Sequence, residues 1–152
     1  MPATRSVADT YVSIAELMRL ARGSYKRAID AEYAVRGIDD VPAPGGYVLA
    51  YLANGEESIP EMIEGLDIKK PEYAEFMDRL VLRGFITRDI DPNDGKASFA
   101  LTERGYAAAE AIFAGGRIVD KQLERKVSAD DIDGLRRGLL ALAEIKQSLP
   151  QP

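Results

Sequence analysis

The chain contains no cysteine and no histidine among its 152 residues. The missing thiols exclude disulfides, a thiol nucleophile and a thiol redox switch, and the missing imidazoles exclude a histidine base and an ordinary zinc site. The sequence also has no phosphate-binding GxxxxGK[ST] loop and no GxSxG nucleophile motif. The acid pairs Asp39-Asp40 and Asp130-Asp131 stand where solvated or capping acids are expected. We therefore predict a protein that is not an enzyme, with no catalytic residues, no metal site and no cofactor.

Long hydrophobic runs are missing as well. Charged residues interrupt the longer apolar stretches, so the sequence predicts no membrane span and no membrane partner. The N-terminal stretch MPATRSVADT lacks the apolar region of a secretory signal peptide, and we expect a cytoplasmic protein. With 46% hydrophobic and 30% charged residues, the chain can bury a sizeable core, and its length suits one compact domain.

The two ends of the chain have the apolar spacing of long helices. From Val7 to Ala28 apolar residues recur at alternating spacings of four and three, which predicts one helix from about Val7 to Val35, ended by Gly37. A last, leucine-rich helix is predicted to open at Ser128. Each apolar stripe either packs in its own domain or forms a seam with another chain, and a homodimer is the simplest way to cover both. The residues expected in that dimer interface are Tyr11, Ile14, Met18, Leu139, Leu142 and Ile145.

The middle of the chain predicts three helices in succession. A short helix ends near Asn54-Gly55, and a second begins at Ser58-Ile59-Pro60-Glu61, where Ser and Glu have the spacing of a capping box. A third helix is expected from Lys69 to Arg83, with Gly84 at its end. Its buried stripe is predicted to be Tyr73, Phe76, Met77, Leu80 and Val81.

A β-hairpin and another long helix follow. The strand-forming segments Phe85–Ile90 and ASFALT flank the turn DPNDGK, whose Gly95 can adopt positive φ. A helix capped by Thr102 is expected from Glu103 to about Val127, with Tyr106 on its inner side and a kink at Gly115-Gly116. Helices followed by a two-stranded hairpin make a winged helix. The predicted fold class is therefore mainly α with a small β-hairpin wing (α+β), flanked by long terminal helices.

Three pieces of the segment from Pro44 to Gly105 resemble the multiple antibiotic resistance regulator (MarR) family. They are "GYVLAYLANGEESIPEMIEGLDI", "MDRLVLRGFITRDIDPNDGK" and "LTERG". The resemblance implies a homodimeric winged-helix transcription regulator that binds pseudo-palindromic double-stranded DNA and is often released by a small, frequently aromatic ligand. It divides the chain into an N-terminal dimerisation helix (1–38), a winged helix–turn–helix module (42–104) and C-terminal helices that complete the dimerisation region (105–152).

The resemblance places a set of residues where a regulator of this family would contact DNA. The wing, however, departs from the family pattern. The candidate DNA-binding residues are Lys69, Lys70, Glu72, Glu75, Arg88 and Lys96. For the two lysines and the two glutamates, the alternative is a solvated side chain that does not contact DNA. The family's wing usually reads Asp-x-Arg, and here either Asp94-Gly95-Lys96 or Asn93-Asp94-Gly95 stands in its place. The first alignment leaves one cation for a minor groove, and the second leaves none there. Arg88 is either a DNA-backbone contact or the partner of an acid such as Asp78.

The charge of the winged module opposes the expected partner. Between Pro42 and Arg104 there are twelve acids and seven bases, a net charge of −5 that equals the charge of the whole chain. Proteins bind duplex DNA largely through basic side chains that neutralise phosphates, so the excess of acids in the winged module keeps a second hypothesis open. A MarR-like dimer could have lost ordinary DNA binding and could act through protein partners or ligand binding.

Four tyrosines are candidates for a ligand pocket between the dimerisation helices and the winged module. They are Tyr11, Tyr25, Tyr33 and Tyr47. Plain packing is the alternative for each of them, because aromatic residues at helical spacing commonly belong to a core.

Overall fold

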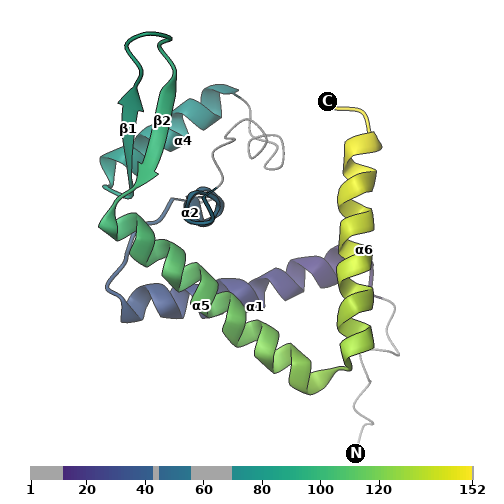
Figure 1. The fold of residues 1–152 in the computed structure, drawn as a ribbon. Coiled ribbons are helices and arrows are strands. Elements are labelled where there is room, and N and C mark those ends of the chain that lie inside the picture. Colours follow the sequence, from purple (N-terminus) through teal and green to yellow (C-terminus); the bar gives the residue numbers. More distant parts are fainter. Residues whose placement is uncertain (1–11, 43–44, 56–69, 152) are drawn as a thin grey trace, which may run out of the picture. The chain divides into compact units, whose positions relative to one another are not determined.

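A computed structural model describes residues 12–42, 45–55 and 70–151 (Figure 1). The predicted mainly helical fold with a small hairpin is confirmed. Its elements are α1 (Ile14–Val35), α2 (Gly45–Ala53), α4 (Lys70–Leu82), β1 (Ile86–Ile90), β2 (Ala97–Leu101), α5 (Glu103–Lys126) and α6 (Ala129–Ser148). The helix expected from Ser58 lies outside the described residues. The chain divides into two compact units, Met1–Gly116 and Arg117–Pro152.

Helix α1 begins later and ends where the sequence predicts. The Ser13 backbone is extended, and its hydroxyl accepts a hydrogen bond from the Glu16 amide at 3.1 Å. Because this bond satisfies a first-turn amide that has no helical partner, Ser13 is an N-cap. The expectation of a helix already running through Val12 and Ser13 is therefore wrong. At the other end Gly37 has a φ of 64°, which ends the helix as predicted.

The core of the first unit lies between α2, α4 and the base of the hairpin. The inward stripe predicted for α4 is confirmed: three of its residues are buried and two are partly buried and packed against the core. Burying one large aliphatic or aromatic side chain contributes about 1.5–3 kcal/mol. The largest fully buried side chains are Phe85, Leu49, Met77, Leu80, Ile86 and Val48.

Helix α5 presents small residues to the core. As predicted, Thr102 caps it, since its hydroxyl accepts a hydrogen bond from the Gly105 amide at 3.0 Å. α5 is one uninterrupted helix through Gly115 and Gly116, and the kink expected there stays a prediction. The inward position expected for Tyr106 is wrong, since this side chain is 57% exposed. Its buried residues are Gly105, Ala108, Ala109, Ala111 and Gly115, and such small side chains bring the helix close to its neighbours.

Helix α6 opens with a capping box. The Ser128 hydroxyl accepts from the Asp131 amide at 3.1 Å, and the Asp131 carboxylate accepts from the Ser128 amide at 3.2 Å. No residue of α6 is buried, and the same holds for α1. Among the residues described, no helix is both long and apolar enough to cross a membrane.

Candidate nucleic-acid interface

Helix α4 has one face in the core and one in solvent. Because Phe76, Met77 and Leu80 point inward, residues at the intervening positions point outward. Glu72, Glu75 and Asp78 follow one another at a spacing of three residues and form a row on the outer side of the helix. The exposed residues of this surface are Pro71, Glu72, Glu75, Asp78, Arg79 and Leu82.

The wing is a regular antiparallel hairpin closed by a tight turn. β1 pairs with β2 from Ile86↔Leu101 to Ile90↔Ala97. Gly95 has a φ of 70°, a conformation that glycine adopts at no steric cost. Two carboxylates stabilise the turn from within: Asp91 accepts from the Asn93 amide and Asp94 from the Lys96 amide, both at 2.8 Å.

Arg88 is an exposed residue whose guanidinium contacts two other side chains of the protein. Its guanidinium forms an ion pair with Asp78 on α4 and lies 5.4 Å from the centre of the Phe99 ring. The pairing with Asp78 that the sequence suggested is thus confirmed, and it joins wing to helix. The hydroxyl of Tyr73 is buried without a hydrogen-bond partner in the described structure, and burial raises the pKa of this phenol while Arg88 lowers it.

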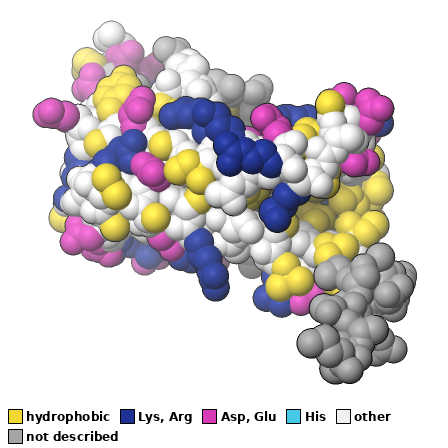
Figure 2. Space-filling model, turned by 90° about the horizontal axis from the view of Figure 1, so that it is seen from below, with side chains coloured by type: hydrophobic (Ala, Val, Ile, Leu, Met, Phe, Trp, Pro, Cys, Tyr) yellow, Lys and Arg dark blue, Asp and Glu magenta, His cyan; other side chains and the backbone are white. Residues whose placement is uncertain are grey.

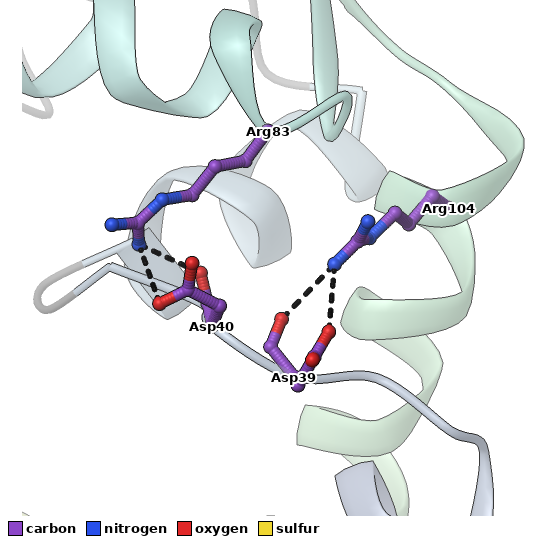
Figure 3. A network of polar contacts seen from close by, with 4 residues as sticks. All are labelled: Asp39, Asp40, Arg83 and Arg104. Atoms are coloured by element: carbon purple, nitrogen blue, oxygen red, sulfur yellow. Dashed lines mark hydrogen bonds and ion pairs between the residues drawn. The ribbon is translucent and has the colours of Figure 1, made fainter.

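Two further arginines bind the linker between α1 and α2 (Figure 3). Arg83 pairs with Asp40, and Arg104 pairs with Asp39, each at 3.2 Å. The Arg104 guanidinium also lies 4.5 Å from the centre of the Phe85 ring. Neither pair was expected from the sequence, because the partners are 43 and 65 residues apart.

The cations of the winged module therefore fall into two groups. Arg83, Arg88 and Arg104 are held in ion pairs within the chain. Arg79 and Lys96 are exposed and form no ion pair with described residues. Of the two lysines before Pro71, Lys69 lies outside the described residues, and Lys70 is the first residue of α4 with its side chain outside the description. Figure 2 shows one face of the molecule, where basic side chains lie among acidic and hydrophobic ones.

The tyrosines proposed for a ligand pocket have different surroundings. Tyr11 lies outside the described residues, and Tyr25 and Tyr47 are exposed. Tyr33 packs against the core, and burial, together with the nearby Asp30 charge, raises its pKa to about 12. An open hollow of about 380 Å³ lies elsewhere, and the predicted tyrosine pocket stays a prediction. The hollow is lined by Arg36, Gly37, Ile38, Asp39, Glu103, Arg104 and Ala107. Within the described ranges, no group of three or more acids is placed to hold a metal ion.

Comparison with known proteins identifies the architecture. No family model and no curated protein matches the sequence. Among solved structures, the S. aureus MepR–DNA complex is 18% identical with a TM-score of 0.68, and the alignment covers 91% of this chain and 100% of that chain. The MarR family transcription regulator SP03579 is 19% identical with a TM-score of 0.69, with 89% and 86% covered.

The reduced form of MarR from E. coli is 22% identical with a TM-score of 0.61, and the alignment covers 93% of this chain and 99% of that chain. The alignments thus cover about nine tenths of this chain and most or all of each neighbour's chain. At such low identities the likeness establishes the fold. This chain has the winged-helix fold of the MarR family regulators.

Proposed function

We propose that this protein is a MarR-type transcription regulator that binds duplex DNA as a homodimer. The observation that carries the proposal is the pairing of an outward-facing helix α4 with a wing in a chain whose fold matches MepR, a protein solved in complex with DNA. Helix α4 would enter the major groove, which is wide enough for a helix, and the wing Asp91–Ala97 would flank it.

The homodimer is proposed from the terminal helices. Neither α1 nor α6 has a buried residue, although both have large apolar side chains. A second copy covers both stripes at once, and such interfaces bury upwards of roughly 2,000 Å². The predicted interface residues that are described are all exposed in the single chain: Ile14, Met18, Leu139, Leu142 and Ile145.

In this proposal the electrostatic contribution to DNA binding is modest. With three arginines paired internally, Lys69, Lys70, Arg79 and Lys96 remain to meet phosphates. Roughly four to eight phosphate contacts for the dimer follow, and affinity should fall steeply as salt rises. Arg88 then acts by holding the wing against α4, and Glu72 and Glu75 are available to accept hydrogen bonds from cytosine amines.

A second candidate function is favoured by the same outer face. Glu72, Glu75 and Asp78 are exposed in one row, and the nearest strand cation, Arg88, is already neutralised by Asp78. A surface of this kind repels phosphate and attracts a basic protein segment. In this alternative the fold is retained while α4 contacts a protein. A small aromatic ligand could regulate either function.

Charge reversal at Glu75 separates the two functions. Glu75 is exposed, so Glu75→Arg should change the free energy of unfolding by no more than about 0.5 kcal/mol. If α4 faces DNA, the variant should bind random duplex more tightly than wild type in fluorescence anisotropy, with a steeper salt dependence. The same measurement on the intergenic duplex next to the protein's own gene tests specific binding.

Glu110→Arg is the matched control, because Glu110 is an exposed acid on α5 rather than α4. Both variants add the same charge, and only Glu75→Arg should strengthen binding markedly. Equal effects of the two substitutions would show that α4 does not face DNA, and the protein-contact function would then replace the regulator function.

A further inference from the structure

We propose that Asp39 and Asp40 are positioning residues that fix α4 and α5 relative to α1, and so set the distance between the two DNA-reading helices of the dimer. The last part of this proposal rests on the proposed function. We call the two ion pairs Asp39–Arg104 and Asp40–Arg83 the linker clasp.

The linker clasp holds main chain as well as side chains. Arg83 Nη1 donates to the Asp40 carbonyl oxygen at 2.8 Å and lies 3.2 Å from its carboxylate oxygen Oδ1. Arg104 Nη2 donates to the Asp39 carbonyl oxygen at 3.1 Å and to its Oδ1 at 3.2 Å. Each guanidinium thus binds two oxygens of one residue, which fixes the path of the linker and not only a rotamer (Figure 3).

Each of the two arginines lies at one end of a helix. Arg83 directly follows α4, which ends at Leu82, and Arg104 is in the first turn of α5. Packing of Arg104 over the Phe85 ring, 4.5 Å from its centre, restricts the orientation of that guanidinium. The clasp therefore joins the exit of α1 to the end of the DNA-reading helix and to the start of the helix after the wing.

The linker backbone is held in an unusual conformation at this point. Asp40 has a φ of 62°, which non-glycine residues rarely adopt, although Asp and Asn tolerate it better than most. The preceding Ile38 is only 8% exposed and anchors the linker in the core. A buried side chain and two arginine contacts on successive residues constrain the linker relative to α4 and α5, while the carboxylates themselves are largely in solvent.

A fixed position of α4 relative to α1 matters because the two α4 helices of a dimer must contact two DNA half-sites at once. In helix–turn–helix dimers the half-sites are about 34–36 Å apart, one helical turn of DNA. If the linker clasp is released, α4 samples a wider range of positions relative to α1. Binding to one half-site is then unchanged, while binding to two correctly spaced half-sites loses its preorganisation.

The test variant is the double substitution Asp39→Asn and Asp40→Asn. Asparagine keeps the side-chain shape and tolerates positive φ, and it removes the two carboxylate charges. The contacts of Arg83 and Arg104 with the main-chain carbonyl oxygens remain, so the variant tests the ion pairs of the linker clasp. Electrostatics alone predicts tighter DNA binding, since two negative charges are lost per chain. The linker clasp predicts the opposite sign for a duplex with two half-sites.

The matched control is Glu16→Gln with Asp30→Asn. These acids form ion pairs with Arg19 and Lys26, and both pairs lie within α1. The control therefore also removes two paired negative charges, but these ion pairs do not connect two different elements. Comparison of the two variants separates the loss of charge from the loss of the link.

Two measurements decide the outcome. The first is affinity for a duplex selected by the full-length protein from a random pool, compared with the same duplex carrying one inserted base pair between its half-sites. Wild type and control should lose affinity on insertion. The linker variant should bind the selected duplex about fivefold or more weakly than wild type and should respond less to the insertion.

The second measurement does not require DNA binding. Because the chain has no cysteine, spin labels can be placed at Arg22→Cys on α1 and Glu75→Cys on α4 without removing any native thiol. Diluting labelled protein with unlabelled protein isolates the distance within one chain. Release of the linker clasp should broaden that distance distribution in the linker variant and not in the control.

A distribution as narrow as that of wild type overturns the proposal, whatever the DNA result. A broadened distribution together with unchanged spacing preference overturns its DNA-reading part. If wild type binds no duplex while the linker variant broadens the distribution, the proposed function fails and the positioning role of Asp39 and Asp40 stands.

Discussion

At the scale of single residues, Gly115 shows how closely α1 and α5 approach each other. A Cβ atom added to Gly115 would lie 2.8 Å from the backbone nitrogen and the Cα atom of Ile29. Backbone atoms cannot rotate away as a side chain can, so the two helices would have to separate. The neighbouring Gly116 has open space, since outside its own stretch of helix no heavy atom lies within 4 Å of the place that an alanine methyl group would occupy.

We predict opposite effects of alanine at these two adjacent positions. Gly115→Ala should destabilise the fold by about 1–3 kcal/mol through overpacking. Gly116→Ala should stabilise it by roughly 0.5–1 kcal/mol, because alanine favours a helix over glycine. Urea unfolding followed by circular dichroism measures both. Similar free energies of unfolding for the two variants would contradict the close crossing of α1 and α5.

Tyr33 gives a residue-scale prediction about alkaline pH. Burial and Asp30 raise its pKa to about 12 in the folded protein, whereas an unfolded tyrosine titrates near about 10. The unfolded state therefore releases this proton first, and the folded state loses stability as pH rises from about 10 to about 12. Tyr33→Phe should lose less stability over that range. Parallel alkaline decreases in the two unfolding curves would reject the raised pKa.

At the scale of elements, the wing carries its one exposed lysine directly after Gly95. The Lys96 amide is held by Asp94 while its side chain remains in solvent. If Lys96 takes the place of the family's wing arginine, it reaches a phosphate or the minor groove. If Gly95 takes that place, the side chain of Lys96 does not touch DNA.

Lys96→Ala distinguishes the two alignments of the wing. With Lys96 at the groove, the substitution should weaken binding to all duplexes alike and reduce the salt slope by about one unit for each phosphate that the lysine neutralises. Lys121→Ala, a lysine exposed on α5, serves as the control. Identical salt slopes for Lys96→Ala and wild type would assign the position to Gly95.

The elements were predictable where local chemistry determines them. The inward stripe of α4, the turn at Gly95 and the capping of α6 by Ser128 each depend on residues within a few positions, and the structure confirms them. The start of α1 was missed because the serine cap at Ser13 competed with an apolar spacing that extended past it.

Interactions between distant segments were not predictable in the same way. The exposure of Tyr106 follows from the small inward face of α5, which only the close approach of this helix to α1 and to Phe85 and Leu101 defines. Likewise, Arg83 and Arg104 are two of the seven bases in the charge count of the winged module, and the fold places aspartates beside both. A charge count cannot reveal which charges neutralise each other.

At the scale of the whole molecule, assembly follows from the helices that the single chain leaves uncovered. Leu139 and Leu142 lie on α6, where no residue is buried, and they are 42% and 37% exposed. In the proposed homodimer both become part of an apolar interface. A charged group placed there would be removed from water without a partner, which costs several kcal/mol.

We therefore predict that Leu139→Glu with Leu142→Glu converts the dimer into monomers in sedimentation velocity at micromolar concentration. Leu82→Glu is the control, because Leu82 is 86% exposed at the end of α4 and is not one of the predicted interface residues. That variant should remain dimeric. A wild-type protein that sediments as a folded monomer would refute the homodimer itself.

The carboxylates inside the wing turn constrain how selection can strengthen DNA binding in such a chain. Asp91 and Asp94 each accept a hydrogen bond from a main-chain amide of the turn. Replacing either with a basic residue therefore adds positive charge but also removes a hydrogen bond that stabilises the turn. Glu75 accepts no hydrogen bond from the described residues and lies beyond the first turn of α4, so its charge can change at little structural cost, whereas Glu72 stands in the first turn, where an acid stabilises the helix. Mutational paths to higher affinity therefore begin on the helix, and the wing acids should be the last to be replaced.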